Sequence, residues 1–468
     1  MKKILVIVLA LVMVFAFAGC SGGTTDQPAS DPAPAPSNDP APAPAAEPEA
    51  GLEAEITIWS YLFSPGWEDM LDGVIADFNQ VYPGVKISNE MLSWDGGPEK
   101  LQIALGTGST PDIYMDGTAR VAALPAQGVL VDITDIMAKY QDKYYSNFFE
   151  IGRLDGKNYL APYAGMWAYQ MTLNSTLAKE LGTYDMLPAD HKSWTWDEFY
   201  EFCKATTEAG KAQGVYSIGL FAGSQSSDAA TYSAMMCNGA EILNGDHTKA
   251  LANSAAGVEV IDFYGRLVKE GIAFPGAATM IDEDLEPLFY SSKMVISPDG
   301  AAAWYSAQVQ ALFDEGSIDA IPDLDVYMWP TPDGGKSGQR TASWGTSINL
   351  ALFKNNEDAA KIEAAKAFTD FCLSREDVQQ AICGASNVPT VFQGIEPVFE
   401  NSNLARMLPN LQEFASFGDS GFGILEPYWI ECRAFFYPEV QAVYAGQKTA
   451  QEALDSYVAN VDAILAAQ

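Results

Sequence analysis

Residues 21–51 most constrain how this chain folds, because they offer no side chain suited to a hydrophobic core. The segment consists mainly of Pro, Ala, Ser, Asp and Glu and contains no aromatic or large aliphatic residue. Such a composition cannot bury enough apolar surface to offset the entropy that is lost on ordering. Its Pro-Ala alternation favours extended polyproline conformations, which rise about 3 Å per residue. We therefore expect a disordered tether over residues 20–53 and a folded part that begins near residue 54.

An apolar segment with a basic tip precedes the tether. Two lysines are followed by residues 4–18, all of which are apolar. A membrane-spanning helix needs about 20 residues, so this segment is typical of a cleaved secretory signal over residues 1–19. The small Ala-Gly pair before Cys20 resembles the lipobox of bacterial lipoproteins, although Phe17 stands where that family most often has Leu. The resemblance implies a lipid on Cys20 and a place on the extracellular face of the bacterial membrane; an ordinary signal or an uncleaved anchor are the alternatives.

The bulk composition limits the partners of the folded part. Residues 54–468 are too many for one compact core, so two lobes are expected. A formal charge of -35 makes nucleic acid and anionic lipid surfaces poor partners. The chain has two histidines and six cysteines without CxxC spacing, which argues against a zinc cluster. We expect no metal and no cofactor.

Strand and helix patterns alternate along the first part of the folded region. Period-two patterns predict strands, and apolar residues at helical spacing predict helices. The predicted strands are 55–59, 85–87 and 111–115, and the predicted helices are 67–82, 100–105 and 119–127. Further helices are predicted to begin after Thr195, which with Glu198 forms a capping box, and to cover 254–268, 358–373 and 449–466. This order implies a mainly parallel α/β sheet.

Several stretches in this order resemble the bacterial extracellular solute-binding proteins that feed sugar importers of the ABC type. They include GTGSTPDIYMDG, DGKNYLAPYAGMWAYQMTLNSTLAKELG, SWTWDEFYEFCKATTEAG, FYSSKMVISPDGAAAW and YAGQKTAQEALDSYV. The resemblance covers essentially all of residues 54–468. It implies a two-lobed periplasmic-binding-protein-like fold of type II, with a cleft between lobes that are joined by hinge segments. Lobe one would be 54–161 and 345–398, and lobe two would be 162–344 and 399–468.

The resemblance also implies a function. Members of the family bind a solute in the cleft, close around it by a hinge motion, and present it to a membrane permease. We therefore expect a monomeric receptor that is not an enzyme, with a carbohydrate ligand and ABC permease subunits as partners. The many aromatic residues favour an oligosaccharide, because each ring can stack on one sugar unit.

A sugar site needs aromatic faces and side chains with hydrogen-bonding groups, placed at the carboxyl ends of parallel strands. The candidates from lobe one and the first crossing lie at or after the ends of predicted strands; core packing is the alternative for Trp59, and a turn cap or a solvated charge is the alternative for Asp116. They are Trp59, Ser60, Trp94, Asp95, Asp116, Tyr163 and Trp167. Asp112 lies at the start of its strand and is predicted to be structural.

The candidates from the second crossing and lobe two depend more on the resemblance. They are Asp299, Trp304, Trp344, Gly345, Trp429 and Arg433, with the polar loop 223–228 as a further possible lining. Trp304 comes two residues later than the stacking Trp of the family pattern. Arg433 occupies an offset that carries Trp in sugar binders, so it either recognises an acidic sugar or pairs with a nearby glutamate.

Other functions share some of these features. A surface glycoside hydrolase would also be secreted and rich in aromatics and carboxylates, but no GxSxG motif is present and no histidine is placed for a triad. The same fold also serves for a polyol, a peptide or a metal chelate, and an interaction protein that has lost ligand binding is a further alternative.

Overall fold

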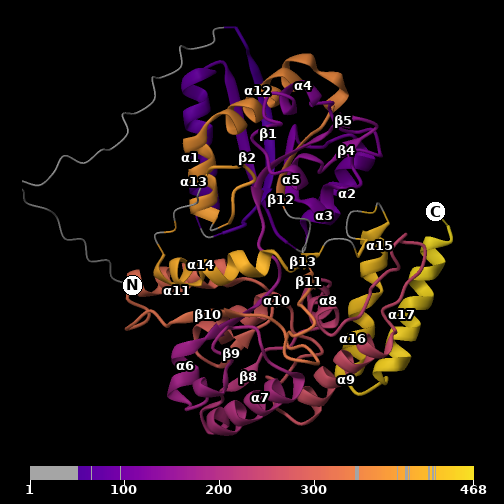
Figure 1. Ribbon diagram of the computed structural model, residues 1–468. Coiled ribbons are helices and arrows are strands. Elements are labelled where there is room, and N and C mark those ends of the chain that lie inside the picture. The colour runs from indigo at the N-terminus through magenta and orange to yellow at the C-terminus, as the bar shows by residue number, and fades with distance from the viewer. Residues whose placement is uncertain are drawn as a thin grey trace, which may run out of the picture. The chain divides into compact units, whose positions relative to one another are not determined.

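The computed structural model has two larger β-sheets, each surrounded by helices, and two short two-stranded ones (Figure 1). It describes residues 51–64, 66–94, 96–342, 347–386, 388–395, 399, 401–419, 422–423, 426 and 428–467, with the side chains of residues 146, 147, 356, 385 and 386 excepted. The predicted signal, Cys20 and most of the tether lie outside this range. We call the five-stranded sheet with its helices lobe one and the four-stranded sheet with its helices lobe two.

The lobe-one sheet has the strand order β2-β1-β3-β12-β6. Strand β1 is parallel to β2 and β3, whereas β12 is antiparallel to both β3 and β6. Strand β12 therefore returns from a distant part of the sequence and fills the place between two strands of the first 165 residues. The strands are β1 (Ala54–Tyr61), β2 (Val85–Leu92), β3 (Ile113–Gly117), β6 (Leu160–Gly165) and β12 (Ser347–Leu352).

Alternation along the strands gives lobe one two different cores. Ile56 and Ile58 of β1 face a large core, and Tyr61 faces a smaller one on the other side of the sheet. The large core receives the apolar stripe of α1 (Trp67–Val81) and is closed by α12 (Ala359–Ser374) and α13 (Glu376–Ser386). The other elements are α2 (Gly97–Thr107), α3 (Thr118–Val121), α4 (Thr134–Met137), α5 (Ser146–Phe149), η3 (Asn355–Glu357) and the hairpin β4 (Arg153–Leu154) with β5 (Lys157–Asn158).

The lobe-two sheet has the strand order β10-β7-β9-β8. Strands β8 and β9 are parallel, and β7 is antiparallel to both β9 and β10. The carboxyl ends of β8, β9 and β10 therefore lie at the same edge of the sheet. The strands are β7 (Met171–Asn174), β8 (Tyr216–Ile218), β9 (Met294–Ser297) and β10 (Leu324–Tyr327). A two-stranded sheet pairs β11 (Thr341–Ala342) with β13 (Gly418–Asp419).

Helices surround the lobe-two sheet, and local capping fixes where several of them begin. Thr195 and Glu198 form the predicted capping box of α7, and Thr449 forms another with Glu452 at α17. The helices are α6 (Ser175–Glu180), η1 (Tyr184–Met186), α7 (Trp196–Gly210), η2 (Lys211–Gln213), α8 (Ser227–Cys237), α9 (Ala255–Lys269), α10 (Asp282–Tyr290), α11 (Ala302–Asp314), α14 (Ser402–Ala415), α15 (Trp429–Ala434), α16 (Phe436–Tyr444) and α17 (Ala450–Leu465).

The predicted elements are largely confirmed, with one correction. The helix predicted over 119–127 is wrong: α3 covers only Thr118–Val121 and turns follow it. Pro125 explains the difference, because proline has no backbone N–H and cannot continue a helix in its interior. Strand β6 continues to Gly165, four residues past the lobe boundary that we placed at 161.

Two further observations concern membranes and cysteines. Among the described residues, no helix combines the length and the apolar character that crossing a bilayer requires. The five cysteines of the described part are buried free thiols, and they are Cys203, Cys237, Cys372, Cys383 and Cys432.

Candidate functional site

Five side chains gather at the carboxyl ends of the lobe-one strands. We call Tyr61, Trp94, Tyr114, Asp116 and Arg120 the lobe-one cluster. Strand alternation places the tyrosines and the aspartate on one face of the sheet, because β1 and β3 are parallel neighbours. Loops at this edge of a parallel sheet are the usual place for a ligand.

Trp94 is the exposed member of the lobe-one cluster. Its ring stacks on Tyr61 with a centroid distance of 4.7 Å and an interplanar angle of 20°. The guanidinium carbon of Arg120 lies 4.9 Å from the Trp94 ring and 4.7 Å from the Tyr61 ring. Tyr61 is fully buried, whereas Trp94 is 38% exposed. The cluster therefore presents one aromatic face that is held in place by a second ring and a cation.

A fully buried carboxylate fixes Arg120. The Nε and Nη2 of Arg120 donate hydrogen bonds of 2.7 Å to the two oxygens of Asp116. The Tyr114 hydroxyl donates to the same carboxylate at 2.7 Å and lies 2.8 Å from the Tyr61 hydroxyl. Burial and the Asp116 charge raise the pKa of Tyr61 to about 12. The Asp116 side chain is itself enclosed, so its role is to hold Arg120 and Tyr114 in position.

The remaining lobe-one candidates have other surroundings. Ser60 is fully buried and accepts a hydrogen bond of 2.8 Å from the indole of Trp67. Tyr163 is also fully buried, edge-on to the Trp67 ring at 6.5 Å. Trp59 is half-buried beneath Lys100, whose Nζ lies 4.1 Å from its ring centroid. Asp95 lies outside the described residues.

Asp112 directly precedes β3, so it lies at the end of the lobe-one strands opposite to the lobe-one cluster. Its carboxylate accepts a hydrogen bond of 2.8 Å from the backbone N–H of Thr57 and lies 3.5 Å from Lys361 Nζ. A polar hollow of about 540 Å³ lies nearby and is lined by Gly108, Thr110, Asn355, Asp358 and Lys361. The structure therefore gives Asp112 the structural role that the sequence predicted.

A second group of side chains gathers at the carboxyl edge of the lobe-two sheet. We call Tyr169, Asp228, Asp299, Tyr305 and Arg433 the lobe-two cluster. Asp228 follows β8 and is the second residue of α8, and Asp299 follows β9 by two residues. Burial, followed by the charges of Asp299 and Asp228, raises the pKa of Tyr169. The phenol of Tyr169 thus lies within electrostatic reach of both carboxylates.

Arg433 forms a bidentate ion pair with Asp228. Its Nε and Nη2 donate to the two carboxylate oxygens at 2.6 and 2.9 Å. The Asp228 side chain is fully buried, and that of Arg433 is 12% exposed. Burial raises the pKa of Asp228, and the Arg433 charge opposes this shift. Such a fork-shaped pair neutralises the buried carboxylate and fixes the guanidinium in one orientation.

Asp299 is held by hydrogen bonds, and no cationic side chain of the described residues forms an ion pair with it. The Tyr305 hydroxyl donates to Asp299 Oδ2 at 2.6 Å, and the backbone N–H of Ala301 donates to Oδ1 at 3.2 Å. Burial raises the pKa of Asp299 to about 6. Gly300 has a φ of +74°, and a Cβ there would lie 2.9 Å from the Tyr169 ring. The turn after β9 therefore requires glycine to bring Asp299 beside Tyr169.

The other lobe-two candidates lie at different depths. Trp429 is fully buried, and its ring lies 5.8 Å from Tyr232 and 5.4 Å from Phe422. Trp167 and Trp304 are half-buried and pack against the lobe-two core. Trp344 and Gly345 lie outside the described residues. In loop 223–228, the Ser226 hydroxyl donates to Asp282 at 2.7 Å.

Sequence reasoning missed several members of both clusters. Tyr61, Tyr114, Arg120, Tyr169 and Tyr305 were not among the candidates. Arg120 had a usable signal, because it is a basic residue only four positions after the candidate Asp116. Tyr61 had one too, because alternation puts it on the opposite face from Ser60.

The described residues contain no group of three or more His, Cys, Asp or Glu side chains arranged to hold a metal ion. What the two clusters offer chemically is an aromatic face, phenol hydroxyls, and carboxylates fixed by hydrogen bonds. Such groups bind the C–H face and the hydroxyls of a polar solute.

Solved structures with the same fold bind sugars. An ABC transporter solute-binding protein of Thermotoga lettingae bound with α-D-tagatose has a TM-score of 0.72 and 18% identity, and the match covers 88% of this chain and 99% of that one. Maltose-bound MalE3 of T. maritima has a TM-score of 0.70 and 19% identity, with the same coverage. These similarities confirm the predicted two-lobed type II binding-protein fold.

Sequence comparisons identify the family. A binding protein of Brucella abortus (strain 2308) is 27% identical over 422 residues, which are 88% of this chain and 93% of the relative. The family model of the bacterial extracellular solute-binding proteins matches residues 65–379, more than half of the chain. The two lobes, the clusters at the carboxyl edges of their sheets and this match lead to one conclusion: the chain belongs to the bacterial extracellular solute-binding protein family.

Proposed function

We propose that this protein is the substrate-binding receptor of an ABC importer and captures a carbohydrate in a cleft between its lobes. The observation that carries the proposal is the exposed ring of Trp94, fixed by Tyr61 and Arg120 at the carboxyl edge of the lobe-one sheet. A ring that is rigid before binding loses little entropy when a sugar stacks on it. Tagatose and maltose, the ligands of the two similar structures, support a sugar as the solute.

The two lobes would contribute different contacts. Trp94 would stack on the C–H face of one sugar unit, while Asp299 and Tyr169 of lobe two would hydrogen-bond its hydroxyls. Ligand that is held by one lobe and then contacted by the other favours the closed form by its extra affinity for that form. Ser60, Asp116, Tyr163 and Trp429 would support these contacts from within the cores, because their side chains are fully buried.

The charges in the lobe-two cluster favour an uncharged sugar. Arg433 is the cation that could recognise an acidic sugar, but its fork is engaged by Asp228. Asp282 and Asp299 add negative charge within reach of Tyr169. A sugar carboxylate would meet this negative charge, and Arg433 would stay paired with Asp228 and would not balance it. We therefore expect a neutral ligand to bind more tightly than its acidic counterpart.

The N-terminal segment would hold the receptor at the membrane. The lipobox-like sequence before Cys20 supports a lipid anchor on the extracellular face of the membrane, and the Pro/Ala-rich segment would act as its tether. The folded part would then reach the permease subunits of its importer. Mass spectrometry of the protein from bacterial membranes tests the anchor: a lipidated N-terminal Cys20 is expected, and a mature chain that begins elsewhere contradicts it.

Isothermal titration calorimetry on a soluble form that begins at Glu53 tests the sugar assignment. The panel pairs neutral mono- and oligosaccharides with their acidic counterparts, and each mixture is then analysed for reaction products. We expect one site with a dissociation constant near micromolar, which corresponds to about -8 kcal/mol, and no product. If no sugar of the panel binds, the sugar assignment is wrong, and polyols or peptides become the candidate ligands. Turnover of a glycan would show a glycoside hydrolase.

A further inference from the structure

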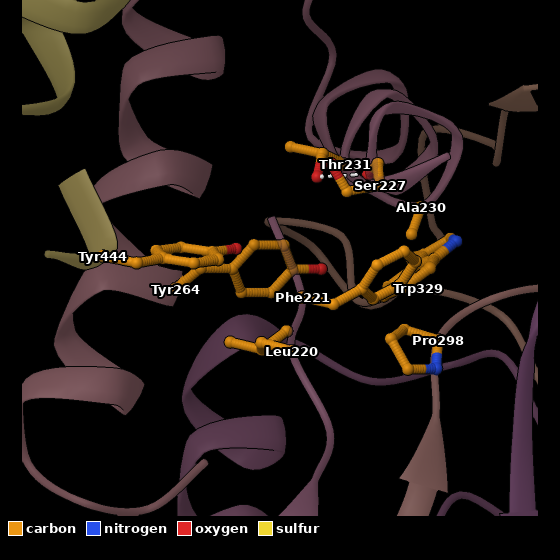
Figure 2. Close-up of a pocket in the computed structure, with 9 residues that line it drawn as sticks. All are labelled: Leu220, Phe221, Ser227, Ala230, Thr231, Tyr264, Pro298, Trp329 and Tyr444. Carbon is orange, nitrogen blue, oxygen red and sulfur yellow. Dashed lines mark hydrogen bonds between the residues drawn. The ribbon is translucent and has the colours of Figure 1, made fainter. Parts of the chain in front are cut away.

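A small internal cavity lies at the carboxyl edge of the lobe-two sheet. Its volume is about 10 Å³. Phe221, Pro298 and Trp329, which follow β8, β9 and β10, form one part of its wall, and residues of α8, α9 and α16 form the rest (Figure 2). The wall is continuous with the lobe-two cluster, because Ser227 precedes Asp228 and Pro298 precedes Asp299.

One polar atom in this cavity lacks a partner. Tyr264 of α9 is 1% exposed, and its hydroxyl makes no hydrogen bond to any described residue. Figure 2 shows this hydroxyl pointing toward the middle of the lining residues. Burial also raises the pKa of the Tyr264 phenol, so the hydroxyl keeps its proton and needs an acceptor. Buried hydroxyls in native proteins are nearly always hydrogen-bonded to protein or to ordered water.

Thr231 of α8 supplies a second polar atom in the wall of the cavity. Its hydroxyl donates 3.0 Å to the backbone oxygen of Ser227, an intrahelical bond that uses its only proton. The two lone pairs of the same oxygen are still able to accept. The indole nitrogen of Trp329 is also buried and makes no hydrogen bond to a described residue, but Figure 2 shows it at one end of the group, away from the Tyr264 hydroxyl.

The size of the cavity and its polar groups determine what can occupy it. A volume of about 10–15 Å³ accommodates one water molecule, and a bound water needs two to four polar partners. No carboxylate lines the cavity, so its wall carries no charge that would balance a buried cation. We propose that the cavity is a binding site for a single structural water, which accepts a hydrogen bond from Tyr264 and donates one to Thr231. This water links α8 to α9, and it lies behind the two segments that contain Asp228 and Asp299.

The sign of a stability change tests this assignment. Replacing Tyr264 by Phe removes only the hydroxyl. If water is bound, Tyr264→Phe removes a hydrogen bond and lowers the midpoint of thermal unfolding by about 1–3 °C. If the cavity is dry, the same change removes an unpaired buried hydroxyl, and an unchanged or raised midpoint would overturn the proposal.

A matched control and a second variant sharpen the test. Tyr232→Phe removes a buried hydroxyl that lies 3.0 Å from the Tyr457 hydroxyl, so it calibrates the loss expected from a real hydrogen bond. If Tyr264 and Thr231 share the water, the combination of Tyr264→Phe with Thr231→Val costs less than the sum of the two single changes. Additive shifts would overturn the shared water.

A high-resolution crystal structure gives a direct readout. We expect a density peak within hydrogen-bonding distance of Tyr264 Oη and Thr231 Oγ1 in the wild-type protein, and we expect it to be lost in Tyr264→Phe. Ordered side chains around a cavity without such a peak would overturn the proposal regardless of the thermal data.

Discussion

The two clusters both neutralise a buried aspartate, but they differ in what surrounds the ion pair. Each contains a fully buried aspartate that a bidentate arginine neutralises, Asp116 with Arg120 and Asp228 with Arg433. In lobe one the arginine lies against an exposed aromatic ring, and its carboxylate has further donors. In lobe two the arginine is more enclosed, and a second carboxylate, Asp299, lies within reach of the same phenol. We expect lobe one to contribute an aromatic face to the proposed sugar site and lobe two to contribute hydrogen-bonding groups.

Removing each arginine should separate the two pairs most clearly. Arg433→Ala leaves a buried carboxylate without its cation, and breaking such a pair costs about 3–5 kcal/mol. Arg120→Ala should cost about half as much, because Asp116 keeps hydrogen bonds from the Tyr114 hydroxyl and the Gly117 backbone. Urea unfolding gives both free energies. Equal losses of unfolding free energy would contradict the expected difference between the two pairs. Partial recovery of stability when Asp228→Asn is combined with Arg433→Ala would support it.

Asp299 should make lobe two the pH-sensitive half. Its pKa is raised from 3.8 to about 6, so between these values the folded state keeps a proton that the unfolded state has lost. This contribution to stability is fully present below pH 4 and is lost as the pH rises through 6. Its full size is at most about 3 kcal/mol.

Asp299→Asn should remove this part of the pH dependence. The free energy of unfolding of the variant, measured from pH 4 to pH 7, should fall less steeply than that of the wild type. The raised pKa of Asp228 affects both proteins in the same way and cancels in the difference. Parallel curves would show that Asp299 does not titrate in this window.

Trp94 should matter for the ligand more than for the fold. Trp94→Ala should weaken binding of the sugar found in the panel about 10- to 100-fold, which is roughly 1.4–2.8 kcal/mol. Stability should change little, because the ring is already 38% exposed. Phe313→Ala is the matched control, since Phe313 is 41% exposed and lies on α11. Equal effects of the two changes on affinity would remove Trp94 from the site.

The smallest expected effect concerns the orientation of Trp94. Arg120→Lys keeps the charge but loses the planar fork that binds Asp116. We expect a loss of affinity of about threefold to tenfold, which is about 1 kcal/mol, with unchanged stoichiometry. Calorimetry measures the affinity, and Arg433→Lys is the lobe-two counterpart. A larger effect than that of Trp94→Ala would mean that Arg120 contacts the ligand itself.

Local signals predicted most of the fold. The apolar stripe of α1 and the capping box of α7 both depend on residues within a few positions of one another. The end of α3 was missed although Pro125 stood in the predicted helix. The sequence thus predicts where elements begin more reliably than where they end.

The site was harder to predict, because its contacts join distant residues. Asp228 and Arg433 are 205 positions apart, so the sequence suggested a nearby glutamate as the partner of Arg433 instead. Trp429 shows a related difficulty: a tryptophan one helical turn from Arg433 suits a site, yet its ring is buried against Tyr232 and Phe422. Residue type and spacing did not show that the Trp429 side of α15 faces the core.

The position of β12 also imposes an order on folding. Strand β12 lies between β3 and β6, although about 180 residues of lobe two separate it from β6 along the chain. Until residues 347–352 are in place, β3 and β6 lack the strand that pairs with both of them. The lobe-one sheet is therefore completed only by a segment that follows lobe two in the chain, and until then the edge of β3 that β12 covers is unpaired.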